Sequence, residues 1–289
     1  MPIVFERRLT QDYCKTICET KRLSAPDHKY NFKDYELNDD DCNELRPKAV
    51  KDACGFYYNA LVSFLQGCHS VMAGCVSWAC VELYYSLYYA TRANLYFKDY
   101  LLIRDRGLYL VKIARGEHPE TRNQKDYNTD HGGTLNHFID KFQTSDFLCS
   151  NTVDTDNVYR WMMDLRETTN YRHKCFREPD CFAELAALFA RIKVEGVAKI
   201  LHEFKADFGT YCFSQNHAWL CAPYYKLLEV AAFYKNCVES LTTDQEQYII
   251  NALKSLGMTE SDIDELLYEV QDEDDEEIEV EIEETEESE

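Results

Sequence analysis

The sequence predicts a mainly α-helical protein, a helical bundle with a small inserted β-hairpin, further C-terminal helices and a disordered acidic tail. Three observations carry this prediction. Residues 53–81 contain no charged side chain, which is typical of helices buried in a bundle. The second half of the chain alternates apolar stripes with helix-capping residues. Residues 271–289 hold 13 acids and no base, and like charges at this density favour disorder or an extended interaction arm.

The first half is expected to contain a helical hairpin followed by a β-hairpin. Pro47 suits the first turn of a helix that runs to Gln66, and Gly67 is expected to stop it. The remaining elements predicted here are a short helix near residues 11–22, a long helix over 70–98, a β-hairpin near 100–113 that turns at 105–107, a loop over 114–133, and a helix from Thr134.

The second half is expected to be helical throughout. Asp154 or Asp156 caps a helix that ends before Pro179. Three more helices are predicted over 180–208, 223–241 and 244–256, and a last one over 259–270 opens with Thr259 and Asp262 as a capping box. The chain then divides into a polar segment over 1–46, a bundle over 47–180, a C-terminal helical region over 181–270 and the tail over 271–289.

The net charge and the cysteine content indicate the compartment and the kinds of site to expect. The formal net charge is -21, of which the tail contributes -13, so residues 1–270 carry only -8. The N-terminus turns charged at once and has no apolar signal core, so the 13 cysteines are expected to be mostly reduced, buried and cytoplasmic. No Cys-x-x-Cys pair suggests a zinc site. We expect no metal and no cofactor.

A membrane span is an alternative for the apolar run. From Val71 to Thr91 only Glu82 is charged. Tyrosines occupy the middle of this window, however, and no basic flank sets an orientation, so a buried bundle helix is the favoured interpretation and no membrane partner is expected.

A basic segment stands out in this acidic chain. Residues 160–177 carry five Arg or Lys against two acids. If the segment is helical, Arg166, Asn170 and His173 lie at i, i+4 and i+7 on one face. A guanidinium can hold a phosphate, an amide can orient it, and an imidazole can move a proton near neutral pH. The alternative is a polar stripe that only satisfies neighbouring backbone groups.

Two segments together resemble a known superfamily. The run from Tyr84 to Leu95, Tyr-Tyr-Ser-Leu-Tyr-Tyr-Ala-Thr-Arg-Ala-Asn-Leu, resembles the second long helix of HEPN-like domains, and Arg166 with six residues before His173 matches their Arg-x4-6-His signature. The resemblance covers about residues 47–180, including the β-hairpin insertion, which looks like that of some uncharacterised bacterial members.

The resemblance implies a homodimer in which two Arg/His motifs face each other. It implies a metal-independent endoribonuclease or an RNA-binding effector, of the kind found in toxin and phage-defence settings. Arg166 and His173 take the signature positions, and Asn170 would orient either one. Glu167 departs from the pattern, because active members have Asn, Asp or His after the arginine. The other basic residues of the segment, which would bind flanking RNA phosphates, are Arg160, Arg172, Lys174 and Arg177.

A second function class stays open on the sequence. The chain contains 21 Tyr and 15 Phe, an aromatic core that could scaffold a partner without catalysis. In this alternative the protein is a helical interaction module whose acidic tail docks a basic protein. The tail could also compete with RNA for the basic segment.

Overall fold

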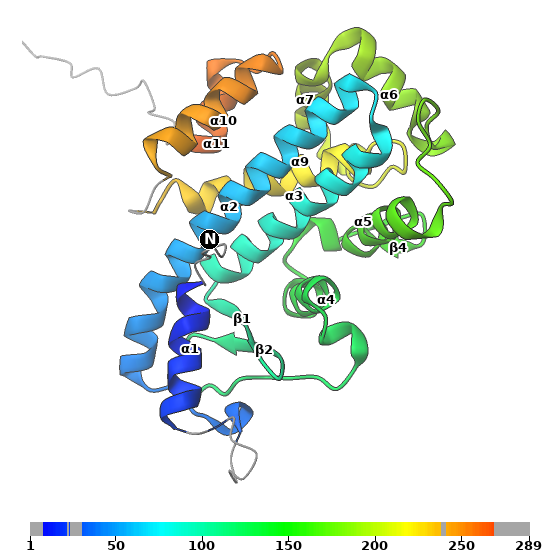
Figure 1. Ribbon diagram of the computed structural model, residues 1–289. Coiled ribbons are helices and arrows are strands. Elements are labelled where there is room, and N and C mark those ends of the chain that lie inside the picture. Colours follow the sequence, from blue (N-terminus) through cyan, green and yellow to red (C-terminus); the bar gives the residue numbers. More distant parts are fainter. Residues whose placement is uncertain (1–7, 22, 24–30, 238–240, 269–289) are drawn as a thin grey trace, which may run out of the picture.

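The computed structural model describes residues 8–21, 23, 31–237 and 241–268, and it is mainly helical as predicted (Figure 1). A long helical hairpin, α2 (Asp39–Ala73) and α3 (Val76–Phe97), forms the centre, and α9 (Ala218–Tyr234) packs against both of its helices. Helix α1 (Leu9–Thr20) lies along the N-terminal half of α2. This central layer positions everything that follows.

The remaining elements pack around the hairpin. They are η1 (Phe32–Asp34), β1 (Tyr100–Asp105), β2 (Gly107–Lys112), η2 (Lys125–Tyr127), α4 (Asp130–Phe142), η3 (Phe147–Cys149), β3 (Thr152–Val153), β4 (Asp156–Asn157), α5 (Val158–Glu167), a π-helical turn η4 (Thr168–Arg172), α6 (Ala183–Glu195), α7 (Val197–Ala206), α8 (Phe208–Tyr211), α10 (Thr243–Ser255) and α11 (Glu260–Leu267). Helices α4 and α5 contact α3 on the side opposite to α10 and α11 (Figure 1).

The predicted start and end of the first long helix were wrong. Helix α2 begins at Asp39, where Asn38 forms a capping box and three acids occupy the first turn, so Pro47 lies inside the helix. Gly67 lies inside α2 rather than at its end, and a Cβ there would lie 2.7 Å from the Leu83 Cγ atom. Gly67 instead lets α2 and α3 approach closely, and Gly74, with a φ of 88°, is the left-handed cap that separates them.

The β-hairpin is confirmed. Strands β1 and β2 pair antiparallel from Tyr100 opposite Lys112 to Asp105 opposite Gly107. Arg106 makes the turn with a φ of 58°. Gln11 in α1 holds the edge of β1, since its side chain donates to the Arg104 carbonyl at 3.0 Å and accepts from the Arg104 amide at 2.9 Å.

Several helices of the second half begin or end at residues other than those predicted, and α9 ends at Tyr234 rather than 241. The helix expected over 180–208 is broken at Gly196, whose φ of 84° separates α6 from α7. Pro223 does not open its helix, because α9 already begins at Ala218. The capping box of Thr259 and Asp262 is confirmed at the start of α11. The predicted acidic tail lies outside the described residues.

One apolar core runs from Cys14 to Leu267, across the domain boundary proposed at residue 180, and the boundary proposed at residue 46 falls inside α2. Most of the 13 cysteines are buried in it as free thiols. Within the described part of the chain, no helix is long and apolar enough to cross a membrane.

A buried ion cluster joins α9 to its neighbours. The Lys226 ammonium lies 2.6 Å from a carboxylate oxygen of Asp146 and 2.7 Å from one of Glu229, and the Lys226 and Asp146 side chains are fully buried. Tyr159 of α5 donates to Asp146 at 2.9 Å, and Asn94 of α3 donates to Glu229 at 2.8 Å. The cluster fixes how α3, α5 and α9 sit together.

We expect Asp262 to make the fold sensitive to acid. Burial alone would raise the pKa of Asp262, but hydrogen bonds from Thr259 and His202 hold this pKa at about 2. Because the folded pKa is depressed, the stabilisation is complete above the unfolded value of about 3.9 and is lost as pH falls toward 2. Asp262→Asn should lower the free energy of unfolding at pH 7 by about 2 kcal/mol and flatten its pH dependence between about 2 and 4.

Urea denaturation at several pH values measures this effect. Glu260→Gln is the control, since Glu260 makes an ion pair with Lys254 while 74% exposed, and it should change stability by less than about 1 kcal/mol. Equal losses in the two variants would contradict the assignment.

Candidate functional site

The segment that carries the three predicted site residues is not one regular α-helix. Helix α5 ends at Glu167, and the next turn, η4, is a π-helix in which the His173 amide donates to the Thr168 carbonyl at 3.1 Å. In a π turn each amide donates to the carbonyl five residues earlier rather than four, so the side chains that follow point in other directions than they would in an α-helix. His173 itself is extended, with φ -82° and ψ 145°. The cap of α5 is Asn157, not Asp154 or Asp156.

Helix α5 instead separates two cavities. Arg160 and Arg166 line the larger one, of about 780 Å³, and His173 and Arg177 line the smaller one, of about 460 Å³. The other predicted site residues, Asn170, Arg172 and Lys174, line neither of these two cavities. The structure therefore brings Arg166 and His173 to different sides of one helix.

Arg166 is buried against tyrosines. Its side chain donates to the Tyr85 hydroxyl at 3.5 Å, and its guanidinium carbon lies 5.5 Å from the centroid of the Tyr84 ring. Its Nε atom is buried with no hydrogen-bond partner, and no described carboxylate lies within ion-pair distance of it. The tyrosine run and the arginine on which the superfamily resemblance rests are thus in contact, and the guanidinium keeps unused donor capacity.

The neighbouring basic residues are engaged differently. Arg172 forms ion pairs with Asp164 at 3.4 Å and Glu167 at 3.3 Å. Arg160 donates to the Asn136 side-chain oxygen at 3.1 Å. Glu167, which the resemblance singled out, lines the larger cavity with Arg166 and has Arg172 as its counter-charge.

The histidine next to Arg166 is His131, in the first turn of α4. The sequence predicted a loop here, but Thr129 caps the helix by accepting from the Gly132 amide at 3.1 Å. A Cβ on Gly132 would lie 2.6 Å from the Asp126 carbonyl oxygen, and one on Gly133 would lie 2.3 Å from Leu108. Both glycines are needed for the start of α4 to pack this closely, and this packing places His131 against α3.

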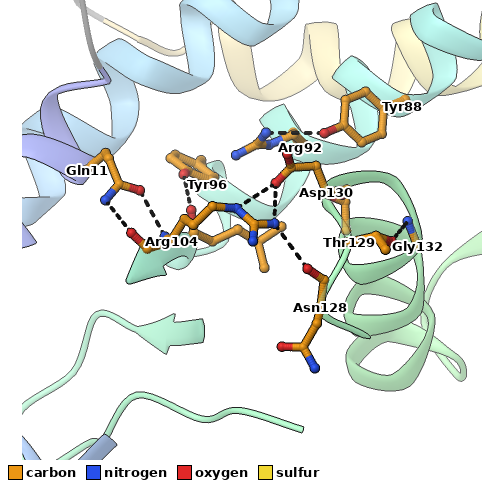
Figure 2. Close-up of polar contacts among 11 residues, drawn as sticks. Gln11, Tyr88, Arg92, Tyr96, Arg104, Asn128, Thr129, Asp130 and Gly132 are labelled. Atoms are coloured by element: carbon orange, nitrogen blue, oxygen red, sulfur yellow. Dashed lines mark hydrogen bonds and ion pairs between the residues drawn. The ribbon is translucent and has the colours of Figure 1, made fainter. Parts of the chain in front are cut away.

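A polar clamp holds the same turn in place (Figure 2). The Arg104 guanidinium of β1 lies 2.7 Å from an Asp130 carboxylate oxygen and also donates to the Asn128 carbonyl at 3.2 Å. The clamp ties the β-hairpin to α4, so Arg104 has its charge neutralised by Asp130.

His131 lies where two cavities meet. It lines both the larger cavity and a third one, of about 500 Å³, that opens toward α1 and the hairpin. Its Nδ1 atom is 3.0 Å from the Tyr84 hydroxyl, and its ring centroid is 4.5 Å from that of Tyr88. Burial, and then the positive charges of Arg166 and Arg92, lower the pKa of His131. The imidazole is therefore neutral at neutral pH and able to accept a proton.

Comparison with known proteins yields no relative. The chain matches no family model, no curated protein and no solved structure. Nor, within the part of the chain that the structure describes, do three His, Cys, Asp or Glu side chains gather as metal ligands do.

His131 and Arg92 are not among the site residues predicted from the sequence. The sequence predicts a loop over 114–133, which includes His131, and a helix only from Thr134. Thr129 followed by Asp130 is a helix-start signal that would have placed His131 inside a helix. No local signal would have shown that this turn faces the tyrosines of α3.

Gly133→Ala is expected to displace the start of α4. The added Cβ would overlap Leu108 and the Tyr127 carbonyl, and overpacking of this kind costs about 1–3 kcal/mol of stability. Thermal unfolding should show the loss, while Gly107→Ala, whose Cβ meets nothing closer than 3.5 Å, should be near neutral. An unchanged melting temperature for Gly133→Ala would contradict the packing described.

Proposed function

We propose that the protein binds RNA and cleaves its backbone, with His131 as the proton acceptor and Arg166 as the cation for the reacting phosphate. One observation carries this proposal: His131 lines one cavity with Arg166 and another with Arg92, and neither arginine has a described carboxylate partner. These are the two groups that RNA cleavage needs when its own 2′-hydroxyl is the nucleophile.

The step is an internal transfer. The 2′-oxygen forms a bond to phosphorus, the bond from phosphorus to the 5′-oxygen breaks, and the products are a 2′,3′-cyclic phosphate and a 5′-hydroxyl. The 2′-hydroxyl proton goes to His131, and the departing 5′-oxygen takes a proton from water. Arg166 would offset the charge that develops on the phosphate oxygens. Tyr84, through its hydrogen bond to Nδ1, would hold the imidazole in one orientation.

The resemblance to HEPN-like domains supports RNA as the substrate class, because Arg166 and the tyrosine run of α3 carry it. It places the histidine at position 173, whereas our proposal uses His131. The homodimer and the toxin or phage-defence setting come from the resemblance alone and stay predictions. The cytoplasmic location stays one too.

A non-catalytic function is the second candidate, and one observation favours it. Four acids, Asp126, Asp156, Asp164 and Glu167, line the larger cavity along with its basic residues. A mixed surface of this kind suits a protein partner with basic side chains better than a polyanion.

Incubation of single-stranded RNA with the full chain in EDTA tests the proposal. We expect fragments that end in 2′,3′-cyclic phosphate. RNA that stays intact and unbound would favour the non-catalytic candidate.

A further inference from the structure

The third cavity, of about 500 Å³, is cationic and aromatic. It lies between the start of α1, the helices α2 and α3, the hairpin and the start of α4. Its lining includes three arginines, Arg8, Arg92 and Arg104, and only one acid, Asp130. Because Asp130 pairs with Arg104 (Figure 2), two positive charges remain without a described ion pair.

These two guanidiniums share one aromatic ring. The guanidinium carbon of Arg8 lies 3.5 Å from the centroid of Phe56, and that of Arg92 lies 4.5 Å from it. Gly55 leaves room for Arg8, since a Cβ there would lie 3.2 Å from an Arg8 nitrogen. Burial and the charge of Arg92 lower the pKa of Arg8, and the Asp52 carboxylate, which forms no described ion pair with Arg8, only partly offsets this. The two cations repel each other, and an anion bound by both would relieve the repulsion.

Arg92 also has a hydrogen-bond donor without an acceptor. It is half-buried, and it donates to the Tyr88 hydroxyl at 3.2 Å (Figure 2). Its Nε atom is buried with no hydrogen-bond partner. A buried N–H without an acceptor is costly, and a guanidinium whose only role is structural would be expected to have its donors satisfied.

The rest of the lining is suited to a flat ring. Tyr85 and Tyr89, one helical turn apart on α3, are half-buried and line the cavity. Aromatic side chains of this kind stack on nucleic-acid bases. A volume of about 500 Å³ lies within the usual range for small-molecule sites.

We propose that this cavity binds a nucleoside monophosphate unit, with its phosphate between Arg8 and Arg92 and its base against Tyr85 and Tyr89. The unit comes either from a free mononucleotide or from the 5′-phosphorylated end of an RNA strand. This binding goes beyond the proposed cleavage; the cavity shares Arg92 and His131 with the cleavage proposal, but nucleotide binding is measured without cleavage.

Calorimetric titration of the full chain with AMP, inorganic phosphate and adenosine at fixed ionic strength tests the proposal. AMP should bind more tightly than either of the others. Arg8→Gln and Arg92→Gln should each weaken AMP binding by about tenfold or more. Arg115→Gln is the control, because Arg115 is 76% exposed and pairs with Asp39 outside the cavity, and it should leave binding unchanged. Tyr89→Leu should weaken AMP binding and leave phosphate binding intact.

Two oligonucleotides, with a 5′-phosphate or a 5′-hydroxyl, separate the sources of the ligand. Preference for the 5′-phosphorylated strand without binding of free AMP supports the RNA end, and binding of AMP supports the free mononucleotide. The proposal is overturned if neither AMP nor the 5′-phosphorylated strand binds, or if binding survives Arg8→Gln. Arg8 lies before the first helix, so this variant decides the matter even if Arg92→Gln fails to fold. No cleavage is measured, so a negative result here leaves the nuclease proposal standing.

Discussion

His131→Gln is expected to abolish RNA cleavage, with a rate lower by about 10²–10⁴-fold. Glutamine retains the size and hydrogen-bonding capacity of the side chain but cannot accept the 2′-hydroxyl proton at neutral pH. RNA binding should persist, because Arg166 and Arg92 are unchanged. Cleavage rates on single-stranded RNA in EDTA, with binding measured in parallel by fluorescence anisotropy, give both quantities.

The matched control is His173→Gln. His173 lines the smaller cavity on the other side of α5, so this variant should cleave at nearly the wild-type rate. The opposite pattern, with loss at His173 and activity at His131→Gln, would overturn our assignment and restore the site predicted from the Arg-x6-His spacing.

The pH dependence of the cleavage rate distinguishes a His131 that accepts the proton from one that only supports the structure. The base must be neutral, so the wild-type rate should rise with pH through the His131 pKa, which lies below the ordinary value of about 6.5. Removing the charge of Arg166 removes one cause of that low pKa. In Arg166→Gln the remaining activity should therefore rise at higher pH than in the wild type.

Lys226→Met is expected to lower the free energy of unfolding by about 3–5 kcal/mol. Lys226 and Asp146 are fully buried, and Lys226 also binds Glu229. The substitution fills nearly the same volume but leaves the buried Asp146 carboxylate without its cation, whereas Glu229 keeps an ion pair with Lys98 at 3.6 Å. Chemical denaturation at pH 7 measures the loss.

Lys199→Met is the control for this prediction. Lys199 makes the same kind of contact, 2.7 Å from Glu195, but is 62% exposed. It should cost less than about 1 kcal/mol, because water screens exposed pairs. Similar losses in the two variants would show that the burial of Lys226 does not set its effect.

Much of the fold followed from local patterns in the sequence. The β-hairpin was predicted from two apolar runs around a short turn, and the capping box from Thr259 and Asp262. The uncharged run over 53–81 predicted buried helices. Each of these signals depends on residues close together in the chain, so it can be found without tertiary information.

The errors arise where distant residues decide the structure. Gly67 looked like a helix stop, but its role depends on Leu83 of the neighbouring helix. Gly132 and Gly133 fell in the predicted loop over 114–133, but they lie in α4 and make room for η2 and β2. Arg166 was found from local charge, whereas its partner histidine lies in α4 and could be assigned only once α3 and α4 were placed together.

The π-helical turn after Glu167 is equivalent to a single extra amino acid inserted into α5. If residues 168–172 were wound as a regular α-helix with every residue kept, Arg166, Asn170 and His173 would return to positions i, i+4 and i+7 of one face. The hydrogen-bond pattern of one helical turn, with no change in the sequence, therefore decides whether Arg166 shares a face with His173.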